Sequence, residues 1–178
     1  MGGREIVMDT KEIQKLICIQ EVLKFNIPCE NVSFFFHGEA DVLSLNRNKY
    51  ISEFEVKISK SDFKAEKKKV TKWMFFEMRT ETHIPNYFWY VCNEGLIQIS
   101  EIPIYAGLMY VVNGELEIIK KPLLLHKKKA DTERIMTKFC KVMSERIHLG
   151  NCRLTYENKE HKKRSDKIFQ EYPDNLLP

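Results

Sequence analysis

The spacing of apolar residues predicts a helix near the start of the chain. From Asp9 to Phe25 the apolar positions fall on one helical stripe, which consists of Ile13, Leu16, Ile17, Val22 and Leu23. Asp9 followed by Glu12 has the spacing of a capping box, so we expect the helix to begin there. The next segment, "NVSFFFHGEADVLSLN", is rich in strand-forming residues and leads into the turn-like sequence "NRNK".

The segment "YISEFEVKIS", residues 50–59, predicts a strand with two different faces, because side chains alternate along a strand. The apolar face consists of Tyr50, Phe54, Val56 and Ile58. The opposite face consists of Ile51, Glu53, Glu55 and Lys57. We expect the apolar face to pack against helices and the charged face to line a cleft.

Beyond this strand the pattern predicts a second helix and several more strands. Ser59 or Ser61 is expected to cap a helix that runs to about Met78. Its inner side would consist of Val70, Trp73 and Met74. The aromatic segment "HIPNYFWYVC" predicts a short buried strand. The segments "LIQISEIP", "AGLMYVV" and "ELEIIKKP" predict a small group of short strands.

The last elements complete a pattern of alternating helices and strands. Asn113 and Gly114 predict a tight hairpin turn. A final helix is predicted from Asp131 to His148, with Ile135, Phe139, Val142 and Met143 as its apolar stripe. The predicted order is α-β-β-β-α-β, then the small β group, then a helix. This order is typical of an α/β or α+β protein with helices on the faces of a sheet.

Composition favours one domain in a reducing compartment. The chain has 178 residues, of which 43% are hydrophobic and 30% charged, which is enough for a sizeable core. It has no run of about eighteen apolar residues, so no membrane span is expected, and its start lacks the apolar segment of a secretory signal. Its five cysteines are widely spaced and form no C-x-x-C pair, so we expect free thiols in a cytoplasm.

Positive charge is concentrated in three short stretches, although the net charge is only +4. The stretches are "KKKVTK" at 67–72, "KKPLLLHKKK" at 120–129 and "KEHKKRSDK" at 159–167. They favour a polyanionic partner such as DNA, whose binding would weaken with salt because phosphate contacts release counterions. The candidate phosphate-binding residues are Lys67, Lys68, Lys69, Lys72, Lys127, Lys128 and Lys129. A solvated lysine surface without a partner is the alternative interpretation.

Two carboxylates and a lysine are predicted to lie close together on the central hairpin. If Leu45 pairs with Ile51, five residues form the loop and Asp41 stands opposite Glu55. A slip of one residue would send Asp41 to the other face. Buried carboxylates need an ion pair or a metal ion, and Mg²⁺ prefers carboxylate, carbonyl and water oxygens. Lys57 beside such an ion would orient a water molecule or stabilise negative charge on a phosphate.

The arrangement of Asp41, then Glu55-x-Lys57, after an N-terminal helix resembles the PD-(D/E)xK nuclease superfamily. Several longer blocks resemble the MmcB-like DNA-repair proteins and related phage and bacterial proteins; they are "EADVLSL", "EFEVKISKSDFKAEKK", "PNYFWYVCNEGLI", "EIPIYAGLMYV" and "KPLLLHKKK". The resemblance extends from Glu39 to Lys129 and includes the preceding helix. It implies an α/β fold with a restriction-endonuclease-like core, in which helices flank a central mixed sheet.

The resemblance also implies roles for individual residues. Asp41, Glu55 and the carbonyl of Val56 would bind Mg²⁺ or Mn²⁺, and Lys57 would be the catalytic lysine. In this superfamily an acid of the first helix often joins the metal shell. The candidates for that acid are Glu12 and Glu21, of which Glu12 already serves the capping box and Glu21 lies late on the helix.

The implied function is a metal-dependent deoxyribonuclease that takes part in DNA repair or phage DNA processing. Such a protein would be cytoplasmic and encoded by a bacterium or phage. It would bind DNA and not membranes, and the sequence does not decide between a monomer and a homodimer. The nuclease-like domain would span residues 1–150, followed by a polar, basic tail at 151–178. Two other classes stay open: a DNA-binding module that keeps this fold without cleaving, and a protein-interaction scaffold.

Other interpretations of the sequence are weaker. Asp41, Glu55 and Lys57 could form a surface ion-pair network on an edge strand, which would contribute little stability. The chain has no G-x-x-x-x-G-K-[ST], G-x-G-x-x-G or G-x-S-x-G motif, so nucleotide hydrolysis, dinucleotide binding and serine hydrolase chemistry lack support. No two histidines have the spacing H-x-x-x-H of a zinc hydrolase.

Overall fold

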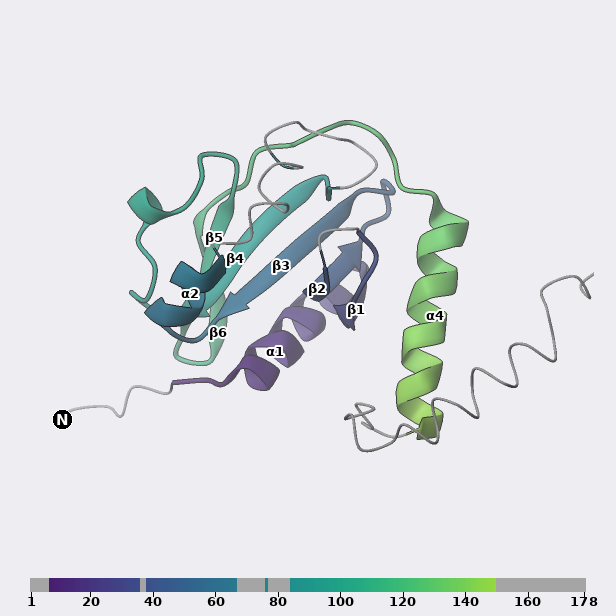
Figure 1. The fold of residues 1–178 in the computed structure, drawn as a ribbon, viewed down its shortest axis with the longest axis horizontal. Helices are drawn as coiled ribbons and strands as arrows, with labels where there is room; N and C mark the ends of the chain where they lie inside the picture. Colours follow the sequence, from purple (N-terminus) through teal and green to yellow (C-terminus); the bar gives the residue numbers. More distant parts are fainter. Residues whose placement is uncertain (1–6, 36–37, 67–75, 77–83, 150–178) are drawn as a thin grey trace, which may run out of the picture. The chain divides into compact units, whose positions relative to one another are not determined.

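The computed structural model describes residues 7–35, 38–66, 76 and 84–149, which include three α-helices and a six-stranded sheet (Figure 1). The chain divides into two compact units, Met1–Cys140 and Lys141–Pro178, and the whole sheet belongs to the first. The predicted tail at 151–178 lies outside the described residues. Within the described ranges, no helix is both long and apolar enough to cross a membrane.

The strands follow one another across the sheet in sequence order. They are β1 (Ile27–Val32), β2 (Ala40–Leu45), β3 (Ile51–Lys57), β4 (Tyr87–Asn93), β5 (Gly107–Val112) and β6 (Glu115–Lys120). Strands β1, β2 and β3 are antiparallel neighbours, β3, β4 and β5 run parallel, and β6 returns antiparallel to β5. The predicted α/β class with a mixed sheet is therefore confirmed. Two strands of the predicted small β group, β5 and β6, extend the same sheet, because β5 pairs with β4 and β6 with β5.

Helix α1 (Thr10–Leu23) begins with the predicted capping box. The Glu12 N–H donates to Asp9 Oδ1 at 2.9 Å, and the Asp9 N–H donates to Glu12 Oε2 at 2.8 Å. The helix ends in a tight turn in which the Asn26 N–H donates to the Glu21 carbonyl at 2.9 Å. Because this turn leads directly into β1, the first strand begins at Ile27, earlier than the predicted segment "NVSFFF".

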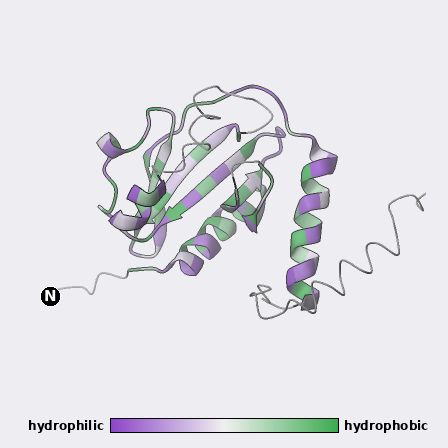
Figure 2. Cartoon of the chain, viewed as in Figure 1, coloured by the Kyte–Doolittle hydropathy of each residue, from purple (hydrophilic) through white to green (hydrophobic). Residues whose placement is uncertain are grey.

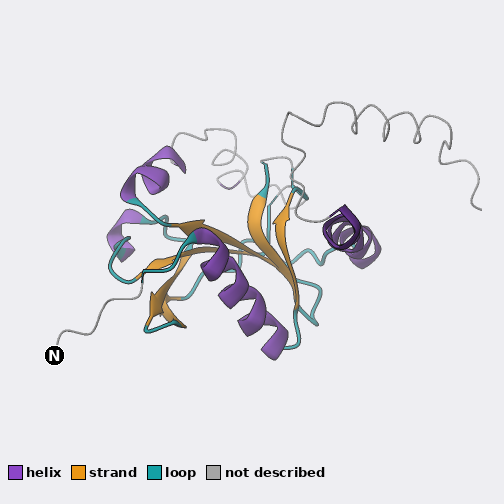
Figure 3. Cartoon of the chain, turned by 90° about the horizontal axis from the view of Figure 1, so that it is seen from below, coloured by secondary structure: helices purple, strands orange, loops and turns teal. Residues whose placement is uncertain are grey.

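Helix α1 packs its apolar stripe on one face of the sheet (Figure 3). Ile13 and Ile17 lie in one buried cluster with Phe54 and Val56 of β3 and Val91 of β4. The expectation that the apolar face of β3 contacts a helix is therefore confirmed. Figure 2 shows hydrophobic and hydrophilic segments alternating along both α1 and β3, as this packing requires.

Helix α2 (Lys60–Glu66) follows the end of β3 and lies on the opposite face of the sheet from α1 (Figure 1). Of the two predicted caps, Ser59 has the role, because its Oγ accepts from the Asp62 N–H at 3.1 Å. Phe63 joins a second buried cluster with Tyr90 of β4. The rest of the predicted second helix, beyond residue 66, lies almost entirely outside the described residues.

A hairpin turn and a short 3-10 helix lie among the connections between the later elements. Asn113 and Gly114 form the predicted hairpin turn, with φ values of 51° and 86°. The segment "LIQISEIP" is not a strand; it contains a 3-10 helix, η1 (Ile99–Glu101), in which the Gln98 N–H donates to the Glu101 carboxylate at 2.7 Å. Helix α4 (Thr132–Leu149) matches the predicted last helix and begins in the first unit.

Candidate functional site

Asp41 lies where the backbone pairing between β2 and β3 ends. The register pairs Leu45 with Ile51, which is the register that a five-residue loop would require, and its last pair is Val42 with Phe54. One step further, the Asp41 carboxylate takes the place of a backbone acceptor: the Val56 N–H donates to Asp41 Oδ2 at 2.8 Å. This bond fixes a carboxylate beside the main chain that follows Glu55.

Gln14 of α1 holds the same carboxylate from the helix side. Its side chain is 4% exposed, and its amide donates to Asn31 Oδ1 at 2.9 Å. The same amide lies 3.4 Å from both the carbonyl oxygen and Oδ1 of Asp41. Sequence reasoning missed Gln14. The signal was its place between Ile13 and Ile17 on an apolar stripe, where a polar residue needs a buried partner.

The two acids of α1 proposed as extra metal ligands are engaged elsewhere. Glu12 serves the capping box, as expected. The buried carboxylate of Glu21 accepts from Ser44 Oγ at 2.7 Å and from Asn26 Nδ2 at 2.8 Å. Ser44 is three residues from Asp41 along β2, about 10 Å away at the rise of a strand. The side chain of α1 that reaches Asp41 is therefore Gln14.

Glu55 and Lys57 lie on the other face of β3, beneath α2. Lys57 Nζ is 2.9 Å from Glu55 Oε1, 3.3 Å from Glu66 Oε2 and 3.5 Å from Asp62 Oδ1. Lys57 is 3% exposed and Glu55 is 5% exposed. The expectation that this face lines a cleft is wrong, because the α2 carboxylates cover the row and neutralise Lys57.

The burial of this row also excludes a surface ion-pair network. Strand β3 is central, between β2 and β4, and not an edge strand. Glu53, on the same face two residues before Glu55, is 0% exposed. Sequence reasoning placed Glu53 on this face but gave it no role. Around the single ammonium of Lys57, the carboxylates of Glu55, Asp62 and Glu66 leave an excess of negative charge when all are ionised.

The surroundings of Lys57 keep its side chain protonated. Burial by itself lowers the pKa of the ammonium, because a low-polarity environment disfavours charge. The charge of Glu55 and its hydrogen bond outweigh burial, and Glu66 and then Asp62 add to this effect, so the pKa lies above its usual value of 10.5. Lys57 is therefore a fixed positive charge at neutral pH and not a proton acceptor.

The donor atoms at this end of β3 are of the type that a hard divalent cation prefers, but they are few. Within the described part of the chain, no group of three or more His, Cys, Asp or Glu side chains gathers in a way that could hold a metal ion. The predicted protein ligands are two carboxylates, of Asp41 and Glu55, and the Val56 carbonyl. Mg²⁺ commonly binds one or two protein carboxylates and keeps several waters, so an oxygen set of this size fits its chemistry.

The predicted DNA-binding lysines fall into a described and an undescribed group. Lys127, Lys128 and Lys129 are exposed on a segment that Asn86 anchors. The Asn86 side-chain amide, which is buried, donates to the His126 carbonyl at 3.0 Å and to the Lys128 carbonyl at 2.9 Å. The remaining candidates lie outside the described residues; they are Lys67, Lys68, Lys69 and Lys72.

A pocket of about 280 Å³ opens beside this anchored segment. Its lining includes Lys128, Lys129 and Arg134, together with the ring of Phe34. The Arg134 guanidinium lies 5.3 Å from the centre of the Phe34 ring, in the range of a cation–π contact. The pocket therefore combines positive charge with an aromatic surface, which suits a phosphate attached to a base.

Comparison with known proteins identifies a similar fold and no function. No protein-family model matches the chain, and no curated protein sequence matches it. Among solved structures, the chain is similar to the SPO1766 protein of unknown function from Silicibacter pomeroyi, with a TM-score of 0.60 and 17% identity. The similarity covers 79% of this chain and 90% of that one. At this identity the two chains share a fold, and nothing about activity follows.

Proposed function

We propose that the chain is a Mg²⁺-dependent deoxyribonuclease with a restriction-endonuclease-like core, related to the PD-(D/E)xK superfamily and its MmcB-like group. One observation carries the proposal: Asp41 binds the backbone N–H of Val56 while Glu55, the preceding residue, contacts the Lys57 ammonium at 2.9 Å. Asp41 and the Glu55–Lys57 pair therefore lie at the same end of the adjacent strands β2 and β3, with Asp41 contacted from the α1 side and Glu55 and Lys57 covered by α2. A mixed sheet with helices on both faces also supports this core.

Each site residue has a distinct part in the proposed reaction. Asp41, Glu55 and the Val56 carbonyl would hold the ion. When bound, Mg²⁺ would polarise the phosphate and make a water molecule more acidic. Lys57 would stabilise the negative charge that develops on the phosphate oxygens. A water oxygen bonds to phosphorus, one ester bond breaks, and the departing oxygen takes a proton from the water.

The exposed lysines would contribute to DNA binding and not to chemistry. Lys127, Lys128 and Lys129 present three positive charges on an anchored segment, and phosphate contacts of this kind are independent of base sequence. The Phe34 ring and Arg134 beside them would contact a sugar or base. Binding and cleavage therefore rest on separate residues and can be tested separately.

A non-catalytic DNA-binding module is the second candidate, and one observation favours it. Lys57 is almost fully buried and already contacts three carboxylates, those of Glu55, Asp62 and Glu66. An ammonium in this state stabilises the fold whether or not a phosphate ever reaches it. In that case the cluster would be structural, and DNA would bind through the lysines alone.

Cleavage assays with matched variants separate the two functions. Single-stranded, duplex and branched DNA are incubated with Mg²⁺, Mn²⁺ or EDTA, using the wild type, Asp41→Asn, Glu55→Gln and the control Glu94→Gln, an exposed acid after β4. The nuclease proposal expects cleavage that EDTA abolishes, that falls at least about a hundredfold in the two site variants, and that persists in the control. DNA binding by a folded wild type without cleavage of any substrate would favour the non-catalytic module.

A further inference from the structure

The pocket of about 280 Å³ beside the segment that Asn86 anchors has accessible groups at its rim. They are of two kinds: the half-buried aromatic ring of Phe34 and three exposed cations. The Arg134 guanidinium adds a second flat surface, because it lies 5.3 Å from the centre of the Phe34 ring. A nucleobase can stack on an aromatic ring or on a guanidinium group. The three cations are Lys128, Lys129 and Arg134.

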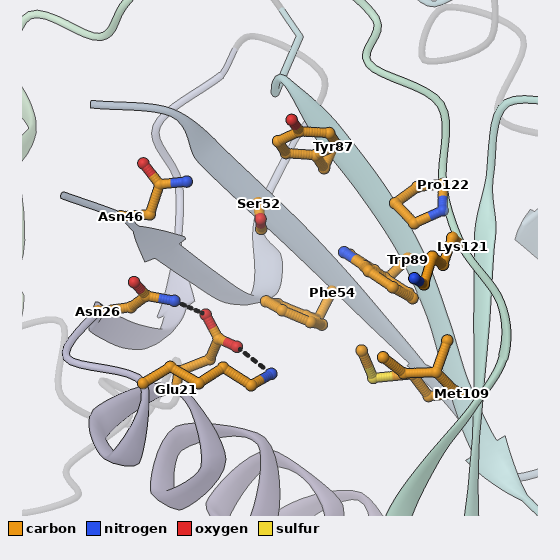
Figure 4. Close-up of a pocket in the computed structure, with 12 residues that line it drawn as sticks. Glu21, Asn26, Asn46, Ser52, Phe54, Tyr87, Trp89, Met109, Lys121 and Pro122 are labelled. Carbon is orange, nitrogen blue, oxygen red and sulfur yellow. Dashed lines mark hydrogen bonds and ion pairs between the residues drawn. The ribbon is translucent and has the colours of Figure 1, made fainter. Parts of the chain in front are cut away.

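The larger pocket of about 340 Å³, on the α1 face of the sheet, is built differently (Figure 4). Its stacked rings, Phe54 and Trp89, are core side chains that are only 2% and 9% exposed. Its acid, Glu21, is 4% exposed and already accepts from Asn26 Nδ2 at 2.8 Å and from Lys24 Nζ at 3.1 Å. Because the fold itself occupies these groups, the smaller pocket is the better candidate for binding a base.

The polar side chains at the floor of the smaller pocket, Asn86 and His126, already have hydrogen-bond partners. The Asn86 amide donates to the carbonyls of His126 and Lys128. The Asn86 oxygen accepts from the Ile51 N–H at 2.8 Å. The His126 ring nitrogens lie 3.1 Å from the Ile84 carbonyl oxygen and 3.3 Å from the Asn86 amide nitrogen. Since these two side chains offer no free group to the edge of a base, binding would depend on stacking and charge and not on base identity.

The rim is held in position and has an excess of positive charge. The Ala130 N–H, next to the lysines, donates to the Lys49 carbonyl at 2.8 Å. The single acid in the described lining, Asp131, accepts from the Arg134 N–H through Oδ1 at 3.1 Å and so caps the first turn of α4. Three cations therefore stand against one carboxylate that already has a role. Such a rim can receive a phosphate with little ordering of its backbone.

The size of the pocket suits a single nucleotide. Its volume is just below the range of about 300–1,000 Å³ that is typical of sites for drug-sized ligands. In duplex DNA each base is paired and stacked inside the helix, so it reaches a pocket of this kind only when it is taken out of the stack. An unpaired nucleotide does not pay this free-energy cost, so the pocket favours single-stranded DNA.

We propose that this pocket takes one unpaired nucleotide, with its base on the flat surface of Phe34 and Arg134 and its phosphate toward Lys128 and Lys129, so that single-stranded DNA is the preferred substrate form. The inference rests on the DNA binding of the proposed function and adds the form of the strand to it. It does not depend on cleavage, because none of these side chains belongs to the acid and lysine cluster around Lys57. Flaps, gaps and overhangs share the unpaired nucleotide and would bind in the same way.

Fluorescence anisotropy with labelled single-stranded and blunt duplex DNA of the same length tests the preference. We expect the single strand to bind the full chain at least about tenfold more tightly, the effect of stacking one base. Phe34→Leu should weaken single-strand binding about fivefold or more and leave the slope of log affinity against log salt unchanged, because lost stacking releases no counterions. Arg134→Lys keeps the charge and removes the planar group, so it should also weaken binding at an unchanged slope.

A strand of abasic nucleotides separates stacking from charge, because it keeps the phosphates and lacks the bases. The wild type should bind it more weakly than the normal strand, whereas Phe34→Leu should bind the two strands nearly alike. Phe25→Leu is the matched control, since Phe25 is an exposed ring outside the pocket. This variant should keep the affinity and the strand preference of the wild type.

The outcomes distinguish this inference from the proposed function. Equal affinity for single-stranded and duplex DNA would overturn the strand preference and leave the proposed DNA binding in place. Binding of neither form would overturn both. Single-strand binding that Phe34→Leu and Arg134→Lys leave unchanged, in proteins that melt at the wild-type temperature, would also overturn the proposal. If Phe34→Leu does not fold, Arg134→Lys and the abasic strand decide, because Arg134 is exposed.

Discussion

At the scale of single residues, the candidate site depends on how two charged side chains are compensated. The Asp41 carboxylate is held by a main-chain N–H of β3 and by Gln14 of α1. The Lys57 ammonium is held by carboxylates of its own strand and of α2. The Lys57 arrangement compensates a charge away from bulk water, which is the condition for keeping a charged group inside a protein, whereas Asp41 is only half-buried. The same pairing makes removal of one partner costly.

Lys57→Met is expected to destabilise the fold by about 3–5 kcal/mol at neutral pH, because it leaves Glu55 and Glu66 buried without their cation. The effect has a defined pH dependence. The pKa of Lys57 is raised in the folded state above the usual 10.5, so its stabilisation is complete below that pH. It is lost as pH rises through the folded-state pKa. Urea unfolding of wild type and variant at a series of pH values measures both effects.

The control for this experiment restores charge balance. Combining Lys57→Met with Glu55→Gln and Glu66→Gln removes the stranded charges and should recover most of the lost free energy of unfolding. If Lys57→Met alone unfolds no more easily than the wild type, the buried ion-pair cluster does not have the energetic role assigned to it.

At the scale of elements, the sequence predicted the features that depend on local patterns, such as the position of a strand and the face that it buries. The alternation from Tyr50 to Ile58 identified β3 and its apolar face. The pairing of Leu45 with Ile51 is one register compatible with the sequence, and the structure has it. The burial of the charged face could not be predicted, because it depends on Glu66, a partner on another element. The contact of Gln14 with Asp41 joins residues far apart in the chain for the same reason.

The close packing of β4 against β5 leaves no room for a side chain at Gly107, which can be tested. Gly107→Ala should destabilise the fold by about 1–3 kcal/mol and change the emission of Trp89, because the new methyl group collides with the indole ring. Chemical denaturation combined with fluorescence measures both changes. A double-mutant cycle with Trp89→Leu identifies the cause. If the indole ring is the obstacle, Gly107→Ala should destabilise the Trp89→Leu protein much less than it destabilises the wild type. Purely additive effects would assign the penalty to the backbone.

At the scale of the whole molecule, fold and chemistry have different support. The mixed α/β sheet is a property of the chain that the SPO1766 protein shares. The proposed nuclease activity rests on three residues and their contacts, and the same fold can keep such residues for stability alone. The overall charge of the chain is a separate consideration. A net charge of +4 is too small to attract DNA strongly unless the lysines of the chain act as local clusters. The proposed DNA binding would therefore depend on particular lysine clusters.

Replacing Lys127, Lys128 and Lys129 together by alanine tests this dependence. Each lysine that contacts a phosphate releases about one counterion, so the slope of log affinity against log salt should become shallower by about 2–3. The affinity should fall equally for DNA of different sequences, because phosphate contacts carry no base information. Fluorescence anisotropy with labelled DNA between 50 and 300 mM salt, roughly the range in which such slopes are measured, provides the data.

A charge-matched control decides whether position or net charge matters. Alanine replaces Lys11, Lys15 and Lys64, which are exposed and outside the anchored segment, so the net charge falls by the same amount. If only the total charge attracts DNA, both triple variants should lose the same affinity and the same slope. If the Asn86-anchored segment is the contact, the control should keep the wild-type slope. If neither triple variant changes the slope, none of the six lysines contacts DNA, and any contact would have to come from other residues, including those outside the described ranges.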